Sequence, residues 1–158
     1  MSQRKLKVLI SDKLASAAVQ IFSNNGIEAD YDPGLGKNSK ELGEIISQYD
    51  GLAIRSNTKV SHELIEKAFK LKVIGRAGIG VDNVNMAAAS AKGIVVMNTP
   101  FGNSVTTAEH TIALILSVAR KIPDANASTQ AGKWEKTKYV GVEVSGKVLG
   151  LIGAGNIG

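Results

Sequence analysis

One segment of the sequence has the residue types and spacing of a dinucleotide site. Gly153-Ala-Gly-Asn-Ile-Gly158 directly follows the aliphatic run Lys147–Ile152. In a Gly-x-Gly-x-x-Gly turn after a strand, the first glycine permits the tight turn and the second lets the backbone approach a pyrophosphate. The third lets the following helix pack on the strand. The pattern predicts cofactor binding by Gly153, Gly155, Asn156, Ile157 and Gly158, and the alternative is a glycine-rich turn with no chemical role.

This pattern is incomplete within the 158 residues. The helix whose N-terminus would hold the pyrophosphate would come after Gly158, and so would the acidic residue ~20 positions on that binds the ribose. We therefore expect the chain to continue beyond Gly158, and the choice between NAD and NADP stays open.

Two arginines have the chemistry of an anion site. Arg55 follows the apolar run Gly51–Ile54, and Arg76 follows the run Leu71–Ile74. Ligands of an open parallel sheet gather beyond the carboxyl ends of its strands. A guanidinium is always charged and binds phosphate or carboxylate in a forked geometry. The pair therefore predicts a site for an anionic small molecule, and the alternative is two surface salt bridges.

The elements needed to position these arginines are predicted by the first hundred residues, where short aliphatic runs alternate with helical patterns. The expected strands are 7–10, 27–31, 51–54, 71–74 and 94–97, and the expected helices are 14–22, 39–49, 61–69 and 82–91. Such alternation is typical of an α/β fold with right-handed crossovers and a parallel sheet covered on both faces. Thr99-Pro100 breaks the pattern, so we place a domain boundary there, giving domains 1–99 and 100–158.

A different pattern follows this boundary. Residues 104–121 predict one helix of roughly 27 Å, and because it is apolar on nearly every face we expect it to be buried on more than one side. Residues 123–146 form a polar connection that contains the only tryptophan, Trp134. The run 147–152 is predicted to be a sixth strand.

Composition excludes several classes of site. The chain has no cysteine and only two histidines, so disulfides, thiolate zinc sites and cysteine nucleophiles are excluded, and we expect no metal site. The net charge of +5 is scattered, which makes nucleic acid a weak candidate partner. The longest apolar stretch, 111–119, is far below the ~20 residues of a membrane span, and no signal peptide is apparent. We expect a cytoplasmic, soluble protein.

Seven stretches, in order along the chain, resemble the D-isomer-specific 2-hydroxyacid dehydrogenases. They are residues 51–56, 72–83, 93–100, 102–104, 108–110, 131–134 and 146–158. The resemblance implies a flavodoxin-like, parallel-sheet substrate domain in residues 1–99 and the beginning of a Rossmann nucleotide-binding domain in residues 100–158. It also implies NAD as the cofactor. The two arginines favour a phosphorylated 2-hydroxy acid as the substrate.

The resemblance also assigns individual residues. Arg55, Arg76, Gly78 and Asn103 are implied substrate contacts, and Ile79 lies in a loop whose N–H groups face the substrate carboxylate and the nicotinamide. Ile79 replaces the threonine of one branch of the family. Asn103 is equally well interpreted as a helix N-cap. The family's catalytic arginine, glutamate and histidine would follow Gly158, so no catalytic residue is assigned, and a polypeptide of these 158 residues alone is expected to be inactive.

The two histidines are assigned no catalytic role. His62 falls in the first turn of a predicted helix and His110 inside the long one. We interpret both as structural or surface residues.

Residues 103–142 are predicted to form a homodimer contact. An apolar helix of this length leaves more surface than its own domain can cover, and Trp134 between Lys133 and Glu135 is typical of an interface anchor. The resemblance agrees, because members of the family dimerise through this helix and arm.

Three other interpretations compete with this one. A phosphoacceptor receiver domain would use Asp12 after the first strand, but it needs an aspartate where this chain has Arg55. A non-catalytic oligomerisation module is favoured by the apolar helix and disfavoured by the substrate loops. Another member of the same family, acting on glyoxylate, hydroxypyruvate or pyruvate, stays open.

Overall fold

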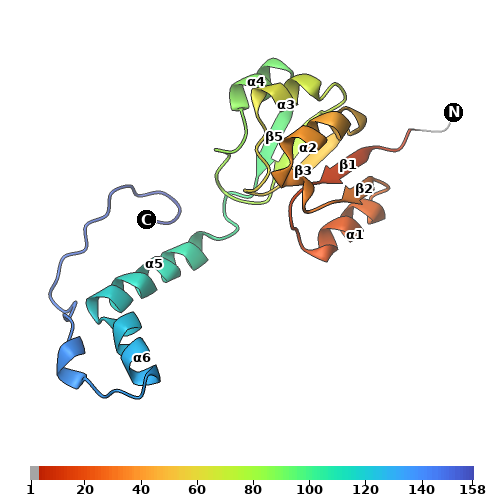
Figure 1. Ribbon diagram of the computed structural model, residues 1–158. Coiled ribbons are helices and arrows are strands. Elements are labelled where there is room, and N and C mark those ends of the chain that lie inside the picture. The colour runs from red at the N-terminus through yellow and green to blue at the C-terminus, as the bar shows by residue number, and fades with distance from the viewer. Residues whose placement is uncertain (1–3) are drawn as a thin grey trace. The chain divides into compact units, whose positions relative to one another are not determined.

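The computed structural model describes residues 4–158, which divide into two compact units, one ending at Gly102 and one spanning Asn103–Gly158. The first unit is a five-stranded, all-parallel sheet in the order β2-β1-β3-β4-β5 (Figure 1). Its strands are β1 (Lys7–Ile10), β2 (Glu28–Tyr31), β3 (Gly51–Ile54), β4 (Val73–Arg76) and β5 (Val95–Asn98). This is the flavodoxin-like strand order, and it confirms the predicted α/β fold with a parallel sheet.

Helices pack on both faces of this sheet (Figure 1). They are α1 (Ser16–Asn24), α2 (Ser39–Ile45), α3 (His62–Lys67) and α4 (Met86–Ala91), with 3-10 turns η1 (Leu35–Lys37) and η2 (Ile46–Gln48). The larger hydrophobic cluster joins α2, α3 and α4 to one face, through residues such as Leu52, Ile65 and Ile74. The smaller cluster packs α1 against Val8, Ile10 and Ala53 on the other face. Alternation along each strand therefore sends neighbouring residues into opposite layers.

Local signals account for most element ends. Gly26 and Gly93 follow α1 and α4 with φ of 71° and 70°, as expected of helix C-caps. The Ser61 side chain accepts a hydrogen bond from Leu64 N at 3.3 Å and begins α3. The fourth helix begins at Met86 instead of the predicted Asp82, because the Asn85 side chain caps it and Val84 pairs with Val60 in an isolated parallel bridge.

The second unit consists of α5 (Ser104–Ala119), α6 (Ile122–Gln130) and the 3-10 turn η3 (Lys136–Tyr139) (Figure 1). The helix α6 lies where only a polar connection was predicted. Lys121, with a left-handed φ of 53°, ends the first helical run, and Pro123 sits in the first turn of the next helix. Proline is compatible with that position because the N–H it lacks has no intrahelical partner there.

The expected burial of the long helix is wrong for the described residues. Only Ser104 of α5 is buried, and Val118 is 77% exposed. Among the described helices and strands, α6 packs most on α5, and it covers only a small part of it. An apolar helix is buried only where other elements supply the covering surface, and its own sequence does not provide one.

The predicted sixth strand is also absent from residues 4–158. Residues 147–152 form exposed coil, with Val148 97% exposed. A strand needs a hydrogen-bonded neighbour to satisfy its N–H and C=O groups, and no described strand lies beside this run. Among the described helices, none is long and apolar enough to cross a membrane.

Candidate functional site

Arg55 and Arg76 lie at the same edge of the sheet. Ile54, the last residue of β3, pairs in register with Arg76, the last residue of β4. Arg55 therefore lies one residue further along the strand direction than Arg76. Arg55 is exposed and Arg76 is half-buried. Within residues 4–158, no salt bridge involves either guanidinium. Two positive charges therefore meet at the carboxyl ends of adjacent strands without carboxylate partners.

The guanidinium of Arg76 lies against the glycine loop that follows it. A Cβ added at Gly78 would overlap Nη1 of Arg76, and one added at Gly80 would lie 4.0 Å from the same atom. The absence of a side chain at Gly78 thus leaves the space that the guanidinium occupies. The Arg76 Nε donates to Asn83 Oδ1 at 2.8 Å, while neither Nη atom has a hydrogen-bond partner among the described residues.

The end of β5 holds this loop in place. Asn98 Nδ2 donates to the carbonyl of Ile79 at 2.7 Å, and Thr99 N donates to the carbonyl of Gly78 at 3.0 Å. Gly78 N is occupied by the carbonyl of Arg76 at 2.9 Å. No hydrogen bond among the described residues uses the N–H of Ile79 or Gly80, so these two donors remain available to a ligand.

Asp12, at the end of β1, organises the loop that carries Arg55. Its buried Oδ2 accepts from Arg55 N at 2.7 Å and from Thr58 N at 3.1 Å. Burial alone would raise the pKa of Asp12, but these hydrogen bonds outweigh it and hold the pKa below its usual value. Ser11 Oγ and Thr58 Oγ1 lie 2.8 Å apart beside it. Asp12 therefore serves as an ionised acceptor for backbone N–H groups.

Asn83 connects the two arginine-bearing loops. Besides accepting from Arg76, its amide nitrogen donates to the carbonyls of Arg55 and Thr58, each at 2.7 Å. Sequence reasoning assigned no role to Asn83, Thr58 or Asn98, and it considered Asp12 only as part of a receiver domain. Apart from the bond between Asn83 and Arg76, their side-chain partners lie 19 to 47 positions away along the chain. Only the motif stretches 72–83 and 93–100, which contain Asn83 and Asn98, offered a signal for two of them.

The remaining predicted site residues lie in the second unit. Asn103 is exposed and occupies the position before α5, but its side chain makes no capping hydrogen bond. Residues 153–158 form an exposed turn in which Gly153 has a φ of 97° and a Cβ on Gly158 would collide with the Gly153 carbonyl. Only glycine suits both positions, and a tight turn at Gly153 is what the first glycine of the dinucleotide pattern provides.

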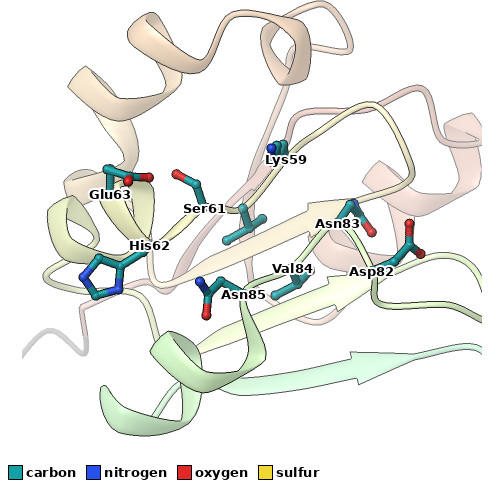
Figure 2. Close-up of a pocket in the computed structure, with 9 residues that line it drawn as sticks. Lys59, Ser61, His62, Glu63, Asp82, Asn83, Val84 and Asn85 are labelled. Atoms are coloured by element: carbon teal, nitrogen blue, oxygen red, sulfur yellow. The ribbon is translucent and has the colours of Figure 1, made fainter.

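A cavity of about 310 Å³ lies between the loops that follow β3 and β4 (Figure 2). It is lined by Lys59, Val60, Ser61, His62, Glu63, Asp82, Asn83, Val84 and Asn85. None of these was predicted as a site residue. The described residues hold no group of three or more His, Asp or Glu side chains suited to a metal.

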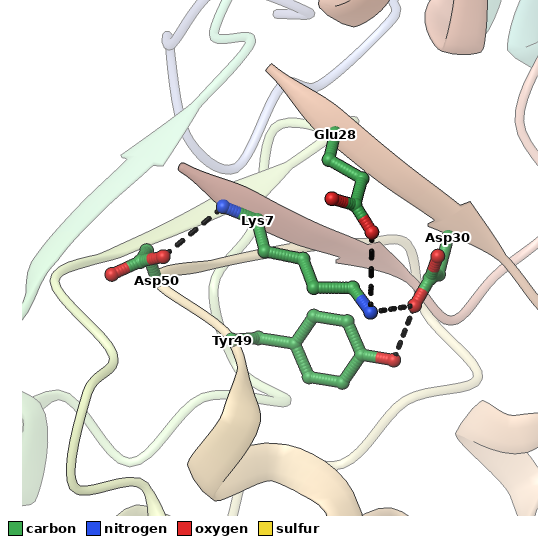
Figure 3. A network of polar contacts seen from close by, with 5 residues as sticks. All are labelled: Lys7, Glu28, Asp30, Tyr49 and Asp50. Carbon is green, nitrogen blue, oxygen red and sulfur yellow. Dashed lines mark hydrogen bonds and ion pairs between the residues drawn. The ribbon is translucent and has the colours of Figure 1, made fainter. Parts of the chain in front are cut away.

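The opposite edge of the sheet carries a second polar network (Figure 3). Lys7 Nζ lies 2.9 Å from Asp30 Oδ2, and Tyr49 donates its hydroxyl to the same oxygen at 2.7 Å. Burial, followed by the hydrogen bond to Asp30, raises the pKa of Tyr49 to about 12. The hydrogen bond from Lys7 is the main reason why the pKa of Asp30 is lowered. Because ligands gather at the other edge, this network is structural.

Comparison with known proteins places these features in context. The family model for the catalytic domain of D-isomer specific 2-hydroxyacid dehydrogenases matches residues 8–150. The D-3-phosphoglycerate dehydrogenase of Archaeoglobus fulgidus is 45% identical over 153 residues, which are 97% of this chain and 29% of that protein. This chain therefore spans less than a third of the curated relative's length.

Two solved structures are also similar. The TT0316 protein from Thermus thermophilus matches 96% of this chain and 50% of its own, with a TM-score of 0.88 and 32% identity. The NAD+-bound 3-phosphoglycerate dehydrogenase of Entamoeba histolytica matches 75% of this chain and 40% of its own, with a TM-score of 0.66 and 31% identity.

Proposed function

Because this chain belongs to the D-isomer specific 2-hydroxyacid dehydrogenase family, we propose that it provides the substrate-binding part of an NAD-dependent enzyme. The proposed reaction oxidises 3-phospho-D-glycerate to 3-phosphohydroxypyruvate, the first step of serine biosynthesis. The identity to the dehydrogenase of A. fulgidus supports this substrate.

One observation carries the proposal: Arg55 and Arg76 end adjacent strands, and neither has a carboxylate partner among the described residues. The substrate has two anionic groups, a carboxylate and a phosphate, and each suits the fork of a guanidinium. The unused N–H groups of Ile79 and Gly80 add donors beside Arg76. We assign substrate binding to Arg55, Arg76, Gly78 and Asn103.

The cofactor is assigned to the glycine turn and to Ile79. Gly153, with its positive φ, allows the tight turn, and the open space at Gly155 fits a close approach of a pyrophosphate. We add Asn156, Ile157 and Gly158 as members of the same turn. These residues would hold NAD, which would supply the acceptor for the hydride from C2 of the substrate. By resemblance, the accompanying hydroxyl proton goes to a histidine beyond Gly158, so this chain's contribution is to bind and orient.

The test is turnover by the enzyme that contains this chain, measured as NADH formation. We expect kcat/KM for 3-phospho-D-glycerate to exceed that for D-glycerate, because the unphosphorylated acid leaves one arginine unpaired. Matched assays with NADP and with D-lactate complete the comparison. Equal kcat/KM for D-glycerate, or a higher value for D-lactate, would assign the chain to another branch of the family.

A further inference from the structure

We propose that Asn83 is a positioning residue for substrate binding, which fixes Arg76 and ties its loop to the loop of Arg55. This inference rests on the proposed function, because it concerns the same anion site. Asn83 lies on the loop after β4 (Figure 2) and makes three hydrogen bonds, at 2.7 to 2.8 Å, to three different residues.

The chemistry of these three partners admits only one orientation of the amide. Arg76 Nε is a donor, so it must face the amide oxygen, whereas the carbonyls of Arg55 and Thr58 are acceptors and must face the amide nitrogen. The amide of asparagine supplies one acceptor and two donor hydrogens on a short stem. Aspartate has no donor for the two carbonyls, so it satisfies only the Arg76 side of this arrangement.

The hydrogen bond to Nε leaves the two Nη groups of Arg76 free to bind an anion. A guanidinium held through Nε presents its two Nη groups as a fork, and neither Nη of Arg76 has another hydrogen-bond partner among residues 4–158. Because Gly78 lies against Nη1 on one side, the fork is confined between the glycine loop and Asn83. Binding therefore does not have to immobilise the Arg76 side chain first.

The same side chain sets the spacing of the two arginines. The backbones of the two loops are already joined where Val60 N donates to the Asn83 carbonyl and Asn85 N donates to the Val60 carbonyl, each at 2.8 Å. The Asn83 amide extends this link toward the substrate edge by holding the carbonyl of Arg55. One residue thus couples both guanidinium-bearing segments.

The test is a double-mutant cycle in the complete enzyme, with KM and kcat for 3-phospho-D-glycerate as the readout. The side-chain ordering that Asn83 supplies corresponds to a rise in KM of about 2- to 13-fold in Asn83→Ala. In an Arg76→Ala background we expect most of that rise to disappear, because the group that Asn83 positions is gone. The matched control is Asn85→Ala, which removes a capping bond to Ala88 N and should lower the melting temperature without changing KM.

A second variant does not depend on the folding of Asn83 mutants. Arg76→Lys keeps the charge, but one ammonium cannot replace both the Nε bond and the fork, so we expect a KM close to that of Arg76→Ala. Wild-type KM in Arg76→Lys, or full additivity of Asn83→Ala and Arg76→Ala, would overturn the positioning role alone. An unchanged KM in Arg76→Ala would instead overturn the proposed substrate contact itself.

Discussion

At the scale of single residues, the two arginines of the candidate site are held differently. Arg76 is half-buried, bonded through Nε and packed against a glycine loop, whereas the Arg55 side chain is exposed and only its backbone is held, by Asp12 and Asn83. Arg76 is therefore preorganised, while Arg55 has to be ordered when an anion binds.

Replacing either arginine by alanine should weaken substrate binding. A hydrogen bond to a charged group is worth ~1.5–3 kcal/mol, so we expect KM for 3-phospho-D-glycerate to rise by roughly 10- to 150-fold in Arg55→Ala and in Arg76→Ala. The Kd of NAD should stay unchanged, as measured by fluorescence titration. Arg4→Ala is the matched control, because its guanidinium pairs with Asp50, which precedes β3 at the opposite edge. Wild-type KM in both site variants would identify Arg55 and Arg76 as ordinary surface charges.

At the scale of elements, the two edges of the sheet have different tasks. At the carboxyl edge, the loops after β1, β3 and β4 are bonded to one another through Asp12 and Asn83, and they leave donors unused. At the opposite edge, where the strands begin (the amino edge), Lys7, Asp30 and Tyr49 join β1 and β2 to the segment before β3. The polar groups of these three side chains bond to one another. Hydrogen-bond donors without a partner are available to a ligand, whereas polar groups that bond to one another stabilise the fold.

The amino-edge network predicts a pH-dependent contribution to stability from Tyr49. Its pKa in the folded protein is about 12, above the ordinary 10.0, so the stabilisation is fully present below pH 10 and is lost as the pH rises toward 12. Tyr49→Phe should lower the free energy of unfolding by about 1–2 kcal/mol at pH 8. Urea unfolding between pH 8 and 12 should show the two proteins converging at high pH. In the control Tyr31→Phe, only a weak 3.4 Å bond to the Leu14 carbonyl is lost, so a comparable loss there would contradict this assignment.

At the scale of the whole molecule, the two units differ in how they bury apolar surface. The first unit encloses two hydrophobic clusters around its sheet. In the second unit, α5 exposes Val105, Ile112, Leu114, Ile115, Leu116 and Val118, and Trp134 is 83% exposed. A patch of this kind commonly marks an interface, which supports our proposal that residues 103–142 form a homodimer contact.

That proposal predicts a dimer that two substitutions dissociate. Ile115→Asp places a charge on the apolar surface of α5, and Trp134→Ala removes the largest exposed side chain, so the complete enzyme with both changes should sediment as a monomer at micromolar concentration. Circular dichroism would verify that the variant is folded. Ile21→Asp, at an exposed apolar residue of α1, should leave the sedimentation coefficient unchanged. A wild-type monomer, or a dimer that persists in the folded double variant, would refute the contact.

The sequence alone determined the features that depend on neighbours along the chain. The five strands and four helices of the first unit were predicted to within a few residues, because hydrophobic periodicity, Ser61 as a cap and glycines at positive φ act locally. The family was also identifiable from its motifs, and the family model matches residues 8–150 of this chain.

Only the tertiary structure decided the features that depend on partners distant in sequence. Residues 147–152 have the composition of a strand but no strand beside them, and α5 is apolar without being buried. The role of Asn83 was also hidden, because two of its three bonds reach residues 25 and 28 positions away. Strand pairing, burial and side-chain hydrogen bonds all require a second surface, and a pattern read along one segment contains no information about where that surface lies.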